Sequence, residues 1–113
     1  MKHIASTATM MHKNGPGCTV WEYGAGEQLD IAIATITGRY PENGFVVNEV
    51  SEEAVYVISG TGNLATRDTR VSLQPGDAVF ITANDPYYFE GEDLRITVSC
   101  TPPWSPDQHK ELA

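Results

Sequence analysis

Two glutamates stand just before the most apolar stretch of the sequence. Glu49 and Glu53 precede the segment 54–58, and the glycine-rich stretch Ser59-Gly-Thr-Gly62 follows it. Carboxylates that share a partly apolar cavity repel each other and lose hydration, so at least one of their pKa values rises. Such a pair is suited to general acid–base catalysis. If both side chains instead lie solvated at a rim, where most carboxylates are found, they do no chemistry.

A second group of candidate residues is aromatic. Tyr87, Tyr88 and Phe89 are consecutive, and Phe80 and Trp104 stand on either side of them in the sequence. Aromatic rings can line a pocket that stacks on a sugar or on another ring. Phe80 and Trp104 are therefore candidate ligand-binding residues. The alternative is that Phe80, Phe89 and Trp104 pack in the core.

Short β-strands must position these residues. Segments rich in β-branched and aromatic residues alternate with glycine, proline and asparagine turns, and no long amphipathic helix is indicated. The expected strands cover residues 19–23, 29–37, 45–50, 54–59, 63–66, 70–73, 78–81, 87–89 and 94–100. Eight to ten short strands predict an all-β sandwich or barrel. The segment 105–113 is expected to carry one helical turn that Ser105 caps.

Length, charge and cysteine content limit the class of protein. A chain of 113 residues has the size of one domain, and its net charge of −8 disfavours a nucleic-acid partner or an anionic membrane surface. No apolar run reaches the roughly 20 residues of a membrane span. No apolar signal core is found in residues 1–17, so a cytoplasmic location is expected. A bridge between Cys18 and Cys100 would join the two ends of the domain, but without an export signal we expect free thiols.

The spacing of two motifs resembles that of the cupins, which form a double-stranded β-helix, or jelly-roll barrel. The stretch from Glu53 to Gly60 fits the glutamate-to-glycine part of the first cupin motif. The sequence Pro75-Gly-Asp77 fits the opening of the second motif, fifteen residues further on. The resemblance covers residues 25–104. We therefore expect a barrel at residues 18–104, an N-terminal arm at 1–17 and a C-terminal tail at 105–113.

The resemblance also predicts which side chains face the interior of the barrel. If Glu53 points inward, strand alternation directs Val55 and Val57 inward as well, and Glu52 outward. Glu49 joins the same cavity only if it lies on the inward face of its own strand. Arg95 is expected on the exposed face.

A typical cupin holds Mn, Fe, Ni or Zn with three histidines and one glutamate, and Glu53 would be that glutamate. The histidine positions fall on Val47 and Glu49, or on Val46 and Asn48 if the motif is one residue longer, and on Tyr87. The three histidines of the chain, at positions 3, 12 and 109, lie outside both motifs. Because the imidazoles are missing, we predict no bound metal and no other cofactor.

Three functions stay open. The one we predict is a metal-independent binding module that holds a small polar or carbohydrate-like ligand among Glu49, Glu53 and Tyr87. The second is an isomerase, epimerase or lyase in which a carboxylate and Tyr87 exchange a proton. The third is a metal-dependent cupin enzyme such as a dioxygenase. Small cupins commonly pair through edge strands and terminal arms, so the resemblance also implies a homodimer that involves residues 1–17.

Overall fold

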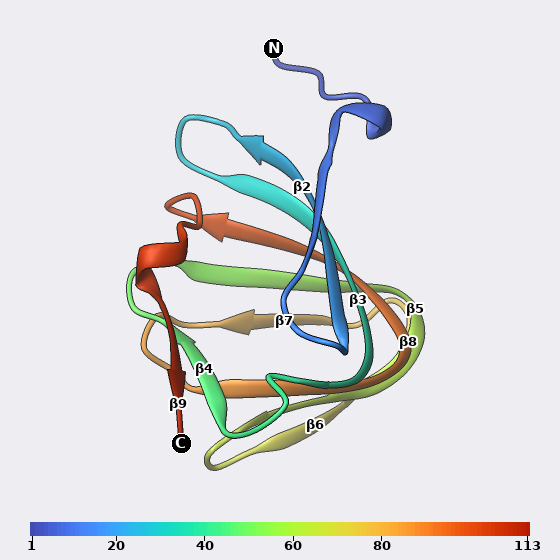
Figure 1. Ribbon diagram of the computed structural model, residues 1–113, viewed down its shortest axis with the longest axis vertical. Coiled ribbons are helices and arrows are strands. Elements are labelled where there is room, and N and C mark those ends of the chain that lie inside the picture. Colours follow the sequence, from blue (N-terminus) through green and yellow to red (C-terminus); the bar gives the residue numbers. More distant parts are fainter.

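The computed structural model describes all 113 residues and is built almost entirely of antiparallel β-strands (Figure 1). The strands are β1 (Met10–Lys13), β2 (Cys18–Ala25), β3 (Asp30–Tyr40), β4 (Phe45–Asn48), β5 (Glu52–Thr66), β6 (Arg70–Leu73), β7 (Ala78–Ile81), β8 (Tyr87–Thr101) and β9 (His109–Leu112). The helices η1 (Ser6–Ala8) and η2 (Pro106–Gln108) are single 3₁₀ turns, and neither is long enough to cross a membrane. The all-β class and the number of strands agree with the prediction.

One curled sheet forms the barrel. Its strands are hydrogen-bonded in the order β1-β2-β3-β8-β4-β9, and β5 pairs with β8, β6 and β7. The long strands β5 and β8 run together across the molecule and bend at one side, while β4 and β9 stand at the other (Figure 1). Each of these long strands joins two segments that the sequence predicts as separate strands.

The bend of β5 depends on a glycine. The pairing of β5 with β8 shifts register between Val57 and Thr61, and Gly60 lies within this shift at a φ of 78°. A β-carbon at Gly60 would overlap the carbonyl oxygen of Asp93 on β8. The motif glycine is therefore required because the two strands approach each other too closely for a side chain.

The strand alternation predicted for β5 is confirmed. Glu53, Val55 and Val57 are all buried, with exposed fractions of 6%, 1% and 0%, whereas Glu52 is exposed. Arg95 is exposed, as expected. Both cysteines are buried, and no disulfide joins them.

The two ends of the chain add strands to the sheet. At the N-terminal end, β1 pairs with β2 and leaves Met10 and Met11 exposed. At the C-terminal end, the predicted turn is present as η2, although no side chain caps it, and the chain then continues into β9. Strand β9, which pairs with β4, was not predicted from the sequence.

The homodimer stays a prediction, and light scattering of the purified protein tests it.

Candidate functional site

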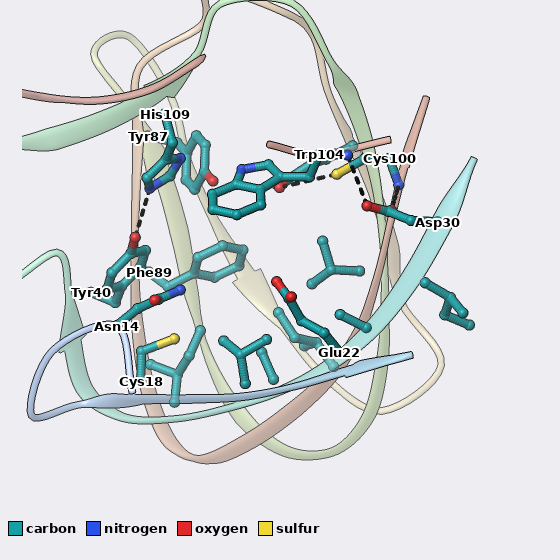
Figure 2. Close-up of a pocket in the computed structure, with 18 of the residues that line it drawn as sticks. Asn14, Cys18, Glu22, Asp30, Tyr40, Tyr87, Phe89, Cys100, Trp104 and His109 are labelled. Atoms are coloured by element: carbon teal, nitrogen blue, oxygen red, sulfur yellow. Dashed lines mark hydrogen bonds between the residues drawn. The ribbon is translucent and has the colours of Figure 1, made fainter. Parts of the chain in front are cut away.

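A cavity of about 180 Å³ lies inside the barrel (Figure 2). Inward side chains of β2, β3, β5 and β8 line it, together with the Trp104 indole and the His109 ring. Most of the lining is aliphatic or aromatic; the polar members are Asn14, Glu22, Asp30, Tyr40, Glu53, Tyr87 and His109. No lysine or arginine contributes to it. The cavity is thus an apolar space with a few polar groups in its wall, as small-molecule sites usually are.

Glu53 is the buried carboxyl group of this cavity. On β5 it lies opposite Cys100 of β8, and its Oε2 accepts a hydrogen bond from Asn48 Nδ2 at 3.1 Å and a weaker one from Cys100 Sγ at 3.6 Å. Neither of the two salt bridges in the structure involves it. Burial raises the pKa of Glu53 above its ordinary value of 4.5, and hydrogen bonds from Cys100, Asn48 and Tyr87 oppose part of that rise.

Asn48 is held in one orientation by two neighbours. The indole Nε1 of Trp104 can only donate, so the Asn48 atom that it faces at 3.0 Å is the carbonyl oxygen Oδ1. The same oxygen lies 2.7 Å from Nδ1 of His109, which must then carry a hydrogen. With Oδ1 fixed in this way, the amide Nδ2 is directed at Glu53, so Asn48 donates to the carboxyl group and cannot turn around.

The tautomer of His109 follows from these contacts. Burial lowers the pKa of His109 below its ordinary value of 6.5, which favours the neutral ring. A neutral ring with its hydrogen on Nδ1 accepts at Nε2, and the Tyr40 hydroxyl lies 2.7 Å from that atom. Tyr40 therefore donates to His109. Figure 2 shows this hydrogen bond at one end of the cavity. Together, Tyr40, His109 and Trp104 hold the Asn48 amide in the orientation in which it donates to Glu53.

Tyr87 is the second buried ionisable group beside Glu53. Its side chain is 3% exposed, and its ring packs edge-on against Phe89 at 5.7 Å between centroids. Burial and the neighbouring Glu53 raise the pKa of Tyr87 well above 10. The phenol therefore keeps its proton and can act as a hydrogen-bond donor.

The opposite part of the lining is made of small side chains. Ala32 and Ala34 of β3 face inward and lie opposite Glu22 and Val20 of β2. Figure 2 shows the Glu22 carboxylate directed into the same space as the Trp104 indole. Because alanines stand where larger residues would fill the interior, this part of the barrel is hollow.

Asp30 and the two cysteines of the lining have structural rather than catalytic roles. The Asp30 carboxylate accepts hydrogen bonds from the backbone N–H groups of Cys100 at 2.7 Å and Trp104 at 2.8 Å, and so holds the segment that places the indole over the cavity. Burial raises the pKa of the Cys18 thiol to about 12, and that of Cys100 rises as well. Neither thiol is activated as a nucleophile.

Three of the five predicted site residues meet at this cavity, and two do not. Glu53, Tyr87 and Trp104 all line it. The side chain of Glu49 is exposed, and its neighbour Asn48 contacts Glu53 instead, so the placement of Glu49 in the site was wrong by one residue. Phe80 is 72% exposed on β7, because the inward position of that strand belongs to its neighbour Ile81. Phe80 is therefore neither a pocket nor a core residue.

The residues present do not fit the metal that cupins usually hold. The hydrogen bond between Asn48 and Glu53 supports the longer of the two motif spacings, which places Val46 and Asn48 at the first two histidine positions and Tyr87 at the third. A valine has no donor atom, and a neutral amide and phenol are poor ligands for borderline ions. No group of three or more His, Cys, Asp or Glu side chains is arranged to hold a metal ion.

Asn48, His109 and Tyr40 were not predicted as parts of the site. The motif spacing marks Asn48 only as a replacement for a metal ligand. His109 lies outside the motifs, yet the pairing of β9 with β4 places it opposite Asn48. Tyr40 carries no motif signal. A prediction that 109–112 forms a strand would have been the one route to His109.

Comparisons with known proteins agree with this architecture. No curated protein matches the sequence significantly. Among solved structures, the nucleoside dehydratase Pac13 of Streptomyces is similar with a TM-score of 0.87 at 14% identity, over 99% of this chain and 91% of that one. The polyketide cyclase RemF of Streptomyces resistomycificus gives 0.76 at 16% identity, over 100% and 86%. An RmlC-like cupin of Shewanella frigidimarina gives 0.73 at 16%, over 95% and 96%.

The sequence itself matches a family model. Residues 41–100, more than half of the chain, match the cupin domain. This segment contains Glu53, Gly60 and Tyr87 in the positions that the two motifs assign to them. The barrel, the paired motifs and the family match agree, and the chain is a small single-domain member of the cupin family.

Proposed function

We propose that this cupin binds a small organic molecule in its cavity and that Glu53 moves a proton to or from that molecule without a metal ion. The observation that carries the proposal is the state of Glu53: a carboxyl group 6% exposed, at the wall of a cavity, with a raised pKa and no cationic partner. A structural carboxylate would normally be paired with a cation or solvated. A raised pKa brings a carboxyl group closer to the pH at which it can both accept and donate a proton.

The neighbours of Glu53 suit the removal of a proton next to a carbonyl group. In the ionised form, Glu53 would remove a proton from the carbon beside the carbonyl group. The Tyr87 phenol would donate a hydrogen bond to the carbonyl oxygen as negative charge develops there. If the next carbon carries a hydroxyl group, the protonated Glu53 would return the proton to it. The C–O bond then breaks, a C=C bond forms, and water leaves. The same first step without loss of water is an isomerisation.

Similar folds in known enzymes support this choice over a passive role. The nucleoside dehydratase and the polyketide cyclase share the barrel with this chain at 14% and 16% identity. At that identity the likeness concerns the fold, so the chemistry proposed here depends on Glu53, Asn48 and Tyr87 of this chain.

One observation favours a second candidate, a binding module without turnover. Every buried side-chain nitrogen and oxygen has a hydrogen-bond partner within the protein. The polar wall is therefore complete without a reacting group, as it would be in a protein that only holds its ligand.

A dehydration assay separates the two candidates. The protein, treated with a chelator, is incubated with 3-hydroxycyclohexanone, and formation of the conjugated enone is followed by its ultraviolet absorbance. We expect turnover that falls by about 100-fold or more in Glu53→Gln, because a general acid–base group contributes roughly 10²–10⁴. Glu52→Gln is the matched control, since its side chain is the exposed neighbour on the same strand.

The possible outcomes point in different directions. Equal rates for Glu53→Gln and the unchanged protein would contradict the role of Glu53. Loss of turnover on chelation, with recovery on addition of a divalent metal, would contradict the metal-independent mechanism. Binding of the hydroxyketone without any turnover would favour the binding module.

A further inference from the structure

The charged side chains that line the cavity have one sign; the Lys2 ammonium lies outside the lining, where it donates to the backbone oxygen of Ala25 at 2.8 Å. No lysine or arginine lines the cavity, and burial favours the neutral form of His109. The ionisable groups that do line it include three carboxyl groups, Glu22, Asp30 and Glu53. Transfer of an anion into such a space removes its hydration and supplies no opposite charge in return, which costs several kcal/mol for a fully buried ion.

The negative groups are spread over the cavity and its mouth. Glu22 is partly exposed, with 41% of its side chain accessible, and it projects into the space shared with Trp104 (Figure 2). The nearest cation to Glu22 is His12, at 4.0 Å and only if that ring is protonated. A carboxylate or phosphate entering the cavity would therefore meet like charge at the mouth before it reaches Glu53.

The volume limits the size of the buried part of a ligand. An apolar cavity of about 150 Å³ can hold one benzene molecule. At about 180 Å³, this cavity has room for one six-membered ring with one or two small substituents. Because the walls around Ala34, Val98 and Ile96 are aliphatic, the ring contacts apolar atoms over most of its surface.

Two of the polar side chains in the lining lie together and can bind a ligand. Glu53 and Tyr87 are next to each other, and both have their ionised forms disfavoured by burial. A neutral oxygen can accept a hydrogen bond from the Tyr87 phenol, and a hydroxyl group can also donate to Glu53. One carbonyl or hydroxyl group on the ring can therefore hydrogen-bond to this pair.

We propose that the cavity selects uncharged molecules with a ring-sized apolar body and one carbonyl or hydroxyl group, and that it excludes carboxylates and phosphates. This inference rests on the proposed function because both assign the ligand to the same cavity. The inference itself concerns only which ligands bind there. A sugar phosphate or a sugar acid would need a cation that the cavity lacks.

Three ligands that share one ring test the proposal. Cyclohexanone, cyclohexanecarboxylate and cyclohexylamine are titrated at pH 7, and binding is followed through the fluorescence of Trp104 in a Trp21→Phe background, which leaves one tryptophan in the chain. We expect saturable binding of cyclohexanone, and binding of cyclohexanecarboxylate weaker by about tenfold or more. Such a ratio corresponds to about 1.4 kcal/mol. We expect the amine to bind more tightly than the carboxylate, because the carboxyl groups of the lining attract a cation, but more weakly than the ketone, which has no charge to desolvate.

Two variants test where the ketone binds and which residue causes the preference for ketone over carboxylate. Ala34→Leu fills the cavity and should abolish ketone binding; if this variant fails to fold, Ala32→Leu replaces it. Glu22→Gln should reduce the preference for ketone over carboxylate by roughly threefold, because it removes one negative charge from the mouth. Glu27→Gln, an exposed glutamate that does not line the cavity, is the matched control and should leave the preference unchanged.

Each contrary result overturns a defined part of the proposal. Carboxylate or amine binding as tight as that of the ketone refutes the selection for uncharged ligands. Absence of ketone binding up to its solubility limit, or binding that survives Ala34→Leu, refutes the assigned site. The proposed function is refuted by a different result. If Glu53→Gln keeps full turnover of the hydroxyketone while the order of ligand affinities is unchanged, the catalytic role of Glu53 is wrong and the selection for uncharged ligands still holds.

Discussion

The interior of the barrel has a packed region and a hollow region, and the long strands β5 and β8 contribute to both. In the packed region, side chains such as Leu64, Leu73 and Leu94 are buried outside the lining of the cavity, with exposed fractions of 3%, 2% and 0%. In the hollow region, Ala32 and Ala34 leave room, and the far wall carries polar groups. The difference shows that inward alternation alone builds the barrel, while the sizes of inward residues decide where a ligand fits. Four predictions test this division.

The largest loss of stability is expected from a truncation in the packed region. Leu94 is completely buried, and Gly62 and Gly91 lie directly against it, so Leu94→Ala leaves a void that little can fill. We expect the free energy of unfolding to fall by roughly 2 to 5 kcal/mol, measured by urea denaturation. A cost below about 1 kcal/mol would show that this region is not tightly packed.

A smaller loss is expected from removing the amide at the polar wall. Asn48→Ala leaves Trp104 Nε1 and His109 Nδ1 without their acceptor and removes one of the donors of Glu53. We expect a loss of roughly 1 to 3 kcal/mol, together with a further rise in the pKa of Glu53. Asn63→Ala is the control, since Asn63 makes only a surface contact with Ser72 at 3.4 Å. Equal costs for the two variants would argue against the buried network.

The third prediction concerns pH. The folded protein holds the Glu53 proton to a higher pH than the unfolded chain, whose carboxyl group titrates near 4.5. The unfolded state therefore binds fewer protons above that pH, so this group's contribution to stability falls until the raised pKa of the folded state is reached. A tenfold difference in proton affinity between the two states corresponds to about 1.4 kcal/mol of stability.

Glu53→Gln should remove this loss, so its stability relative to the unchanged protein should increase as the pH rises from 4.5. The comparison is made by urea denaturation across a pH series. The lowered pKa of His109 acts in the opposite direction, since its contribution is lost as the pH falls below 6.5, but it is present in both proteins. A constant difference between the two across the series would mean that burial does not shift the titration of Glu53.

The smallest effect on stability is expected in the hollow region. Ala34→Leu adds apolar volume where the structure has space, so we expect a change within about 1 kcal/mol, either way. Thermal unfolding measures it. A loss as large as that of Leu94→Ala would show that the region is already full, and the contrast between the two regions would disappear.

Most of the fold could be predicted from the sequence because its signals are local. The stretch from Glu53 to Gly60 and the turn at 75–77 set the register, and turn residues separate most of the strands. Glu53 and Tyr87 followed from motif positions. Glu49 was misplaced because shifting a strand by one residue exchanges its two faces, and the sequence allowed both spacings. Phe80 was misplaced because all four residues of 78–81 are apolar, so only pairing with β5 shows which ones point inward.

The remaining site residues depend on distant pairing. His109 lies in a short strand with polar neighbours, and nothing in 109–112 indicates a strand. Its contact with Asn48 spans 61 positions, and that with Tyr40 spans 69. Such contacts are set by the closed sheet, which a reading of neighbouring residues does not supply.

The late position of His109 has a consequence for synthesis on the ribosome. Strands β2 to β8 have all emerged before residue 109 leaves the exit tunnel, so the nascent sheet can curl while the His109 partner of Asn48 is still missing. During that interval Tyr40 has no imidazole to donate to, and Asn48 is held by Trp104 alone. The carboxyl group of Glu53 thus acquires its complete surroundings only when β9 has paired with β4.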